Sequence, residues 1–515
     1  MKKIIICDYG SQYTFLIARK LRELGIYSEI VDGRGMKSPV TEETKGIILS
    51  GSPDSVKNQD AALLPLWVLE SELPVLGICY GMQVLSHFFG GQVESHEKRE
   101  YGRESIHIGE TTHSIASSLF KETPASQTVW MSHGDDVRVS GQEFEIFARS
   151  ESGAVAAIVH KTKPLLGIQF HPEVHHSDFG SKILLNFAKN ICGMENNWTP
   201  VNIMEQIAVQ LKSELKDESK LVLAISGGVD STVCAVLLTK ILGPKRVTCL
   251  FVDHGLLREG EAEETFTNLK NLGLNVHLLE RSQLFLERLK EKADPEEKRK
   301  IIGKTFIEVF ENFVGENPEF THLVQGTLYP DVIESAGTGS KSSVIKSHHN
   351  VGGLPAHLKL KLLEPFRYLF KDEVRRIGKE LNLEHSLTQR HPFPGPGLAI
   401  RIVGEVTEEK LRIARKADHI FIESLRRENF YDKIWQAGVV LLPVKSVGVM
   451  GDERSYEWVC SLRAVHAVDA MTAHVGDLPL SFLCRVADQI VRNVKGINRV
   501  LYDVTSKPPA TIEWE

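Results

Sequence analysis

The sequence predicts an α/β protein with two domains built on parallel sheets, followed by a smaller α+β domain. In the first third of the chain, short apolar runs alternate with helical stretches, which is typical of a parallel sheet with crossover helices. A second series of the same kind runs from Lys220 to about Glu384. The rest of the chain, from about His391, begins with three prolines and two glycines within residues 392–397, which forbid regular structure there. After this stretch the regular alternation of strands and helices does not continue.

Four apolar runs in the first third are expected to form strands: Lys3–Asp8, Tyr27–Val31, Gly46–Ser50 and Val75–Ile78. The polar, turn-rich stretch at residues 192–200 is suited to a linker. The sequence therefore predicts a first domain over residues 1–191 and a second over residues 198–390.

The last part, residues 391–515, is expected to form the α+β domain. A charged helix over Thr407–Arg427 is followed by strand-like runs at Val439–Gly451 and Trp458–His466, and then by a helix over Ser481–Val494.

Composition and charge limit the classes of function. A chain of 515 residues corresponds to about three domains, and 42% hydrophobic with 25% charged residues is typical of a globular protein with sizeable cores. The formal net charge of −6, with no long basic run, argues against a nucleic-acid-binding surface. Seven cysteines without a C-x-x-C pair predict neither a disulfide framework nor a zinc site. With no signal peptide and no apolar run of membrane length, we expect a cytoplasmic protein without a membrane partner.

Cys79 lies between a short apolar strand and a helix expected over Met82–Phe89, flanked by Gly77 and Gly81. The pattern G-x-C-x-G has the spacing of a nucleophile elbow, in which small neighbours permit a tight turn that exposes the side chain. A helix N-terminus behind the sulfur favours the thiolate. The alternative is a buried core cysteine, which is the commoner role of this residue type.

A thiol nucleophile needs a base, and the base needs an orienting group. His171 and Glu173 follow a strand expected over Leu165–Phe170, and residues two apart in an extended chain point to the same side. His171 is the candidate base and Glu173 the group that holds the imidazole. The alternative for a single histidine is a surface position or a satisfied place in the core.

With Cys79, His171 and Glu173 in these positions, the segment 1–190 resembles the class I (triad) glutamine amidotransferases. The resemblance implies that Cys79 is the nucleophile, that His171 and Glu173 complete the triad, and that glutamine is hydrolysed to release ammonia. Gly51, in "LSGSP", and Tyr80 would offer backbone N–H groups to the oxyanion. "SHGD", residues 132–135, matches a stretch near the glutamine pocket of that family.

"SGGVDST" follows an apolar strand and precedes a helix, so its backbone N–H groups and hydroxyls can close on phosphate. No Walker lysine follows, and the alternative is an ordinary strand–turn–helix connection. The stretch resembles the pyrophosphate loop of N-type ATP pyrophosphatases, with further matches at residues 251–257 and 326–335. The resemblance implies an ATP site at this loop: Ser226, Gly227, Gly228, Val229, Asp230, Ser231 and Thr232.

The same resemblance implies Mg²⁺ near Asp230, because magnesium prefers oxygen ligands. Asp331 and Glu334 are three residues apart at a loop-to-helix start and are placed near the metal by this reading. The alternative for both is N-terminal capping of that helix.

An amidotransferase in front of this loop, together with "IKSHHNVGGLP" (345–355) and "SKPPATIEWE" (506–515), resembles the GMP synthetase family along essentially the whole chain. The resemblance implies a carbon–nitrogen ligase that uses glutamine, ATP and xanthosine monophosphate (XMP), with Mg²⁺. It also implies a homodimer in which residues 391–515 form the dimerisation domain and complete the XMP site. The alternatives are a coupled synthetase with another acceptor, or a signalling amidotransferase or peptidase with an inactive second module.

A nucleotide phosphate needs cations and N–H donors, and a carboxylate can accept from the base or ribose. The motif positions give seven candidates for XMP binding: Arg299, Lys346, His348, His349, Lys507, Ile512 and Glu513. The alternative for any one lysine is a solvated surface charge.

Overall fold

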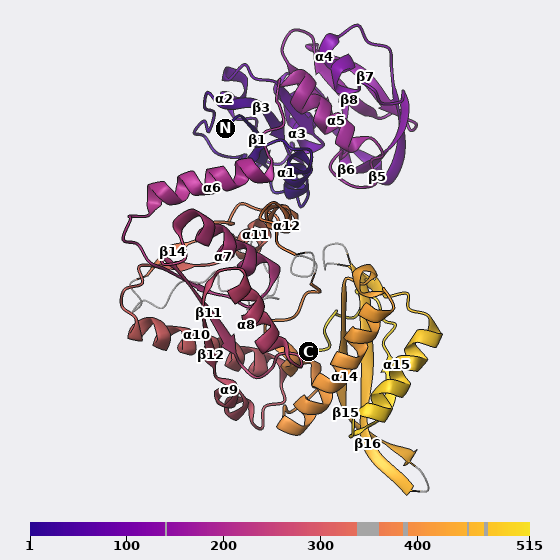
Figure 1. The fold of residues 1–515 in the computed structure, drawn as a ribbon. Helices are drawn as coiled ribbons and strands as arrows, with labels where there is room; N and C mark the ends of the chain where they lie inside the picture. The colour runs from indigo at the N-terminus through magenta and orange to yellow at the C-terminus, as the bar shows by residue number, and fades with distance from the viewer. Residues whose placement is uncertain (140–141, 337–359, 385–389, 451–452, 468–471) are drawn as a thin grey trace. The chain divides into compact units, whose positions relative to one another are not determined.

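The computed structural model describes residues 1–515 apart from 140–141, 337–359, 385–389, 451–452 and 468–471 (Figure 1). Its contacts divide the chain into two compact units, Met1–Ile203 and Met204–Glu515. No helix in the described parts is both long enough and apolar enough to span a bilayer.

The first unit is built on a nine-stranded sheet in the order β2-β1-β3-β4-β9-β8-β7-β5-β6. Its parallel half contains the four expected strands: β1 (Lys3–Asp8), β2 (Ser28–Asp32), β3 (Thr44–Leu49), β4 (Val75–Ile78) and also β9 (Leu165–Ile168). Buried isoleucine, valine and leucine side chains fill these strands, as expected for a sheet covered on both faces. The helices are α1 (Thr14–Glu23), α2 (Leu66–Glu70), α3 (Tyr80–Phe88), α4 (Ser114–Leu119) and α5 (Gly180–Asn186).

The other half of this sheet is antiparallel, which the sequence did not predict. Its strands are β5 (Gln92–Ile108), β6 (Ser126–Val139), β7 (Phe144–Ser150) and β8 (Val155–His160). The parallel-sheet prediction therefore holds for the half that carries Cys79.

The second unit begins with a five-stranded parallel sheet in the order β12-β11-β10-β13-β14. The strands are β10 (Leu221–Ala224), β11 (Val247–Asp253), β12 (Asn275–Glu280), β13 (His322–Val324) and β14 (Lys361–Leu363). The order reverses between β10 and β13, and α/β sheets bind ligands at the carboxyl ends of the strands at such a reversal. The boundary between the units falls within α6 (Pro200–Glu214). The helices that follow are α7 (Val229–Leu242), α8 (Glu261–Asn271), α9 (Ser282–Leu289), α10 (Pro295–Glu316), α11 (Tyr329–Ala336) and α12 (Lys371–Glu380).

The C-terminal part is α+β, as predicted. In Figure 1, α14 (Glu408–Arg427) and α15 (Leu480–Asn493) lie along the long hairpin of β15 (Gln436–Met450) and β16 (Glu453–Ala467). Two shorter strands, β17 (Ala473–Val475) and β18 (Ile497–Tyr502), pair with β16.

One hydrophobic core joins the two parts of the second unit across the proline-rich stretch. Leu256 and Phe285 belong to the same buried cluster as Leu398, Phe421 and Phe482. Side chains on both sides of residue 390 are therefore held in a common core.

Candidate functional site

The turn at Cys79 has the strained geometry of a nucleophile elbow. Cys79 has φ 54° and ψ −107°, directly between β4 and α3. A Cβ added to Gly77 would lie 2.5 Å from the Gly81 carbonyl carbon, and one added to Gly81 would lie 2.3 Å from the Leu49 carbonyl oxygen. Only glycine therefore fits on either side of the thiol, which gives the G-x-C-x-G spacing its physical reason.

Cys79, His171 and Glu173 meet in a buried cluster. His171 Nδ1 lies 2.6 Å from Glu173 Oε1, and the imidazole also hydrogen-bonds the Cys79 side chain. Burial opposes a charge on His171, but Glu173 and the contact with Cys79 outweigh it and raise the pKa of His171 well above its ordinary value. The imidazole therefore lies where a general base for a thiol nucleophile must lie, with Glu173 as its orienting group.

Backbone contacts fix the imidazole in this place. The strand β9 ends at Ile168, two residues earlier than expected, and the following chain turns toward β6. The His171 N–H donates to the Trp130 carbonyl at 2.9 Å, and the Ser177 hydroxyl donates to the His171 carbonyl at 2.6 Å. The Tyr13 ring meets the imidazole edge-on, with 4.8 Å between ring centroids.

The thiol has two further contacts, and the sequence did not predict the one with Gln169. Gln169 Nε2 donates to Cys79 Sγ at 3.7 Å, and the thiol lies 3.8 Å from the carbonyl oxygen of Ser132, within the "SHGD" stretch. The alternation of side chains along an extended chain offered a signal for Gln169, because it lies two residues before His171.

Both predicted oxyanion donors border the thiol and imidazole. A Cβ on Gly51 would lie 3.4 Å from His171 Cε1, so the "LSGSP" turn passes directly beside the ring. Tyr80 is the first residue of α3, where the backbone N–H has no acceptor within the helix. These positions leave two backbone donors for the charge that develops on an amide oxygen attacked by Cys79.

The "SGGVDST" loop lies at the carboxyl end of β10, at the point where the strand order reverses. Gly227 has φ 73°, and the Gly228 N–H donates to Ser226 Oγ at 3.3 Å. The Ser231 hydroxyl donates to the Gly228 carbonyl at 3.2 Å, whereas Thr232 is buried. The loop thus opens α7 with backbone N–H groups and hydroxyls at a helix N-terminus, an arrangement suited to phosphate.

Asp230 lies in the first turn of α7, and its Oδ2 is 3.3 Å from Lys371 Nζ on α12. Asp230 Oδ1 is buried without a hydrogen-bond partner among the described residues. A buried carboxylate oxygen without a hydrogen-bond partner, next to a phosphate loop, is suited to bind a cation. Within the described parts of the chain no group of three or more His, Cys, Asp or Glu could hold a metal, so phosphate oxygens would have to supply the remaining ligands.

Asp331 accepts a hydrogen bond from the Leu328 N–H at 3.0 Å, which is the capping contact given above as its alternative. The side chain of Glu334 lies outside the described residues, as do Lys346, His348 and His349.

The C-terminal tail is held in place rather than frayed. Arg463 on β16 donates to the carbonyls of Thr505 at 2.6 Å and Thr511 at 3.0 Å, and it pairs with Asp503 at 3.2 Å. The backbone of Lys507 exchanges two hydrogen bonds with Ala473 on β17, at 2.8 and 3.0 Å. The tail therefore has a defined path across the C-terminal sheet.

The structure brings Arg299 and the end of the tail together. The Arg299 guanidinium donates to the Glu515 backbone carbonyl, and Lys298 forms an ion pair with the Glu515 side chain. Ile512 and Glu513 border a small cavity together with Arg401, Gln436, Gly438 and Arg463.

Three family models match the chain. "Glutamine amidotransferase class-I" matches residues 5–191, "NAD synthase" matches residues 203–303, and "GMP synthase C terminal domain" matches residues 423–514. The first covers the cysteine elbow and the triad, the second covers the phosphate loop, and the third covers the tail up to Trp514.

Curated relatives match over the full length. The glutamine-hydrolysing GMP synthase of Thermosipho melanesiensis is 50% identical over 521 residues, covering 100% of both chains. That of Aquifex aeolicus is 51% identical over 518 residues, covering 100% of this chain and 99% of its own. That of Cytophaga hutchinsonii is 50% identical over 515 residues, covering 100% of both.

Proposed function

The chain belongs to the glutamine-hydrolysing GMP synthase family, and we propose that its residues divide the reaction among three parts. It is a ligase that makes GMP from XMP, ATP and glutamine. Residues 1–191 form the glutaminase, 198–390 the ATP pyrophosphatase and 391–515 the dimerisation domain, which completes the XMP site.

In the glutaminase, Cys79 attacks the side-chain amide of glutamine, and His171 passes a proton to the leaving ammonia. Glu173 holds the imidazole and supports its positive charge. The N–H groups of Gly51 and Tyr80 stabilise the oxyanion, and water then releases glutamate from the thioester. The observation that carries this assignment is the 2.6 Å contact between His171 and Glu173 at a thiol on a strained turn.

In the synthetase, the "SGGVDST" loop holds the phosphates of ATP while the O2 of XMP is adenylated and pyrophosphate leaves. Ammonia then displaces AMP to give GMP. The position of the loop at the strand-order reversal supports this role.

We include Mg²⁺ in the proposal because Asp230 fits it, with one buried oxygen that no described residue satisfies. Bound Mg²⁺ offsets the negative charge of the triphosphate. Asp230 would hold the ion from the first turn of α7, and Lys371 would hold Asp230 in place. We place Asp331 and Glu334 near the same ion.

The XMP site is tested by replacing Lys507 with alanine and measuring pyrophosphate release with ammonium as the nitrogen source. A charge-assisted hydrogen bond to phosphate is worth roughly 1.5–3 kcal/mol, so the KM for XMP should rise about ten- to a hundredfold. The KM for ATP should change little, because the contact is to the other nucleotide.

Lys495→Ala, which removes an exposed lysine from the same C-terminal domain, is the matched control and should leave both KM values unchanged. An unchanged KM for XMP in the Lys507→Ala variant would assign the tail a packing role only.

We also propose a homodimer in the cytoplasm. Val447 on β15 lies directly opposite Tyr456 on β16, and both side chains are exposed, by 59% and 66%. Val449 is exposed on the same face, so a row of large apolar groups faces solvent on this hairpin. All seven cysteines are free, which suits a reducing compartment.

Placing two charges on this face should convert the dimer to a monomer. The double variant Val447→Asp/Tyr456→Asp is expected to elute at the monomer mass in size-exclusion chromatography with light scattering, because desolvated like charges oppose the contact. Val209→Asp alters an equally exposed valine on α6 and should remain dimeric. A dimer that survives both substitutions on the hairpin would place the interface elsewhere.

A further inference from the structure

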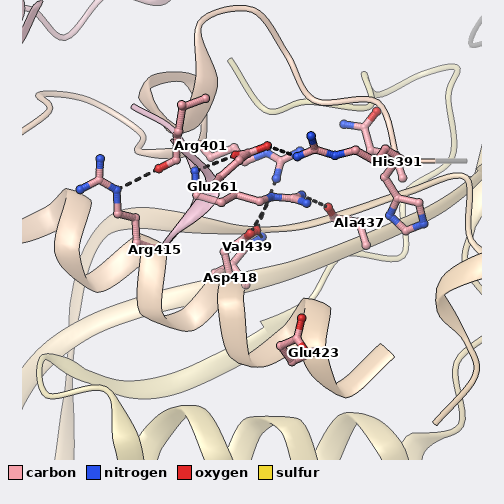
Figure 2. Close-up of polar contacts among 12 residues, drawn as sticks. Glu261, His391, Arg401, Arg415, Asp418, Glu423, Ala437 and Val439 are labelled. Atoms are coloured by element: carbon pink, nitrogen blue, oxygen red, sulfur yellow. Dashed lines mark hydrogen bonds and ion pairs between the residues drawn. The ribbon is translucent and has the colours of Figure 1, made fainter. Parts of the chain in front are cut away.

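Three arginines and three carboxylates form a chain of contacts between the phosphate loop and the C-terminal tail, and the mechanism above uses none of the links between them. All six residues lie within the second unit, and Figure 2 shows the centre of this chain of contacts. In order from the loop they are Arg390, Glu261, Arg258, Asp418, Arg401 and Glu513.

On the loop side, Arg390 reaches the backbone of the phosphate loop. Its Nη1 donates to the Gly227 carbonyl at 3.4 Å, and its guanidinium also forms an ion pair with Glu261 on α8. The other oxygen of Glu261 accepts from the Arg258 backbone N–H at 2.9 Å. The loop is thereby linked to the segment that carries the Arg258 side chain.

At the centre, Asp418 on α14 is fully buried and binds two arginines (Figure 2). Its Oδ2 lies 2.9 Å from Arg258 Nε, and its Oδ1 lies 3.4 Å from Arg401 Nη1. The Val439 N–H on β15 donates to the same Oδ1 at 3.0 Å. One carboxylate therefore joins the phosphate-loop side and the tail side to a rigid strand.

On the tail side, Arg401 is 2% exposed and binds Glu513 through two hydrogen bonds, of 3.0 and 2.8 Å. A Cβ on Gly438 would lie 2.1 Å from Arg401 Nη1, so the strand makes room for this guanidinium. The Phe393 ring lies under both guanidinium groups, at 4.9 Å from Arg258 and 5.2 Å from Arg401. The positions of the two arginines are thus fixed by the same aromatic ring.

Stability alone does not explain such a chain. Buried ion pairs lose hydration, and well-packed apolar residues in their place are often as stable. What the charges do provide is fixed geometry, because a bidentate arginine–carboxylate pair has one favoured orientation. Adenylation needs that precision, since the acceptor oxygen and the phosphorus must approach to about 3–3.5 Å in line.

We propose that Asp418 is a positioning residue of the synthetase reaction. It holds Arg258 and Arg401 at fixed places and so fixes the distance and orientation of the tail relative to the phosphate loop. The inference rests on the proposed roles of the loop in ATP binding and the tail in XMP binding.

The first test is Asp418→Asn, which keeps the side-chain volume and removes the charge. The kcat for pyrophosphate release with XMP, ATP and ammonium should fall by about 10²-fold, the loss expected from a misplacement of about 1 Å. Glu423→Gln, on the same helix but paired with the exposed Arg426, is the matched control and should keep the wild-type kcat. A normal kcat in a folded Asp418→Asn variant overturns the proposal.

The second test is a double-mutant cycle that does not require Asp418 to be changed. Glu261→Gln acts on the loop side and Glu513→Gln on the tail side, and the two carboxylates bind different arginines. At distant, independent sites the loss of kcat/KM in the double variant equals the product of the two single losses. If the two sites are linked, the loss in the double variant should differ from that product by at least about threefold. The cycle of Glu423→Gln with Glu513→Gln should be multiplicative.

A multiplicative result for Glu261 and Glu513 overturns the proposal even where Asp418→Asn fails to fold. The proposed function fails separately, and visibly, if the wild-type enzyme releases no pyrophosphate from ATP in the presence of XMP.

Discussion

Replacing Cys79 with alanine abolishes GMP formation from glutamine and leaves GMP formation from added ammonium at the wild-type rate. The thiol serves only the hydrolysis of the amide, and free ammonia bypasses that step. Loss of a triad nucleophile lowers kcat by on the order of 10⁴-fold or more. The measurement is GMP formed from XMP and ATP with each nitrogen source in turn.

Cys192→Ala is the matched control, because Cys192 is a buried cysteine in the same unit whose sulfur packs against Gly46, away from the elbow. It should keep both activities. Equal loss with glutamine and ammonium in the Cys79→Ala variant would mean that Cys79 supports the fold, and the proposed division of the chain into glutaminase and synthetase would fail with it.

The elbow was predictable because its causes are local. The two glycines, the cysteine and the ends of the neighbouring strand and helix lie within a few residues. The structure explains the glycines, because a Cβ added at Gly77 or Gly81 would lie only 2.5 or 2.3 Å from backbone atoms. His171 and Glu173 were also predictable, since the end of a parallel strand brings its side chains to the same sheet edge as Cys79. The antiparallel half of the sheet was not, because no short pattern distinguished it.

The charged chain around Asp418 could not be found in the sequence. Arg401 and Glu513 are 112 residues apart, and a single sequence does not pair distant charges. The packing of the proline-rich stretch could not be predicted either. An apolar run such as the one at Leu398 can pack within its own domain or against the preceding domain. The structure buries Leu398 in a core that also contains Phe285 from α9.

Asp230→Asn should lower pyrophosphate release from ATP and XMP by about 10²–10⁴-fold, because the charge that an Mg²⁺ ligand contributes is worth several kcal/mol in the transition state. Asparagine keeps the shape of the side chain and its place in the first turn of α7. The remaining rate should also require more Mg²⁺ for half saturation. Basal glutaminase activity should be unchanged, since Cys79 and His171 belong to the other unit.

Asp217→Asn provides the matched control for Asp230→Asn, because Asp217 is an exposed aspartate in the turn that precedes β10, at the opposite end of that strand. The same loss of one negative charge there should leave the rate and its Mg²⁺ dependence unaltered. The two results together separate ligation at the loop from a general change of charge. Normal pyrophosphate release by Asp230→Asn at the wild-type Mg²⁺ concentration would reduce Asp230 to an ion-pair partner of Lys371, and the buried Oδ1 would need another explanation.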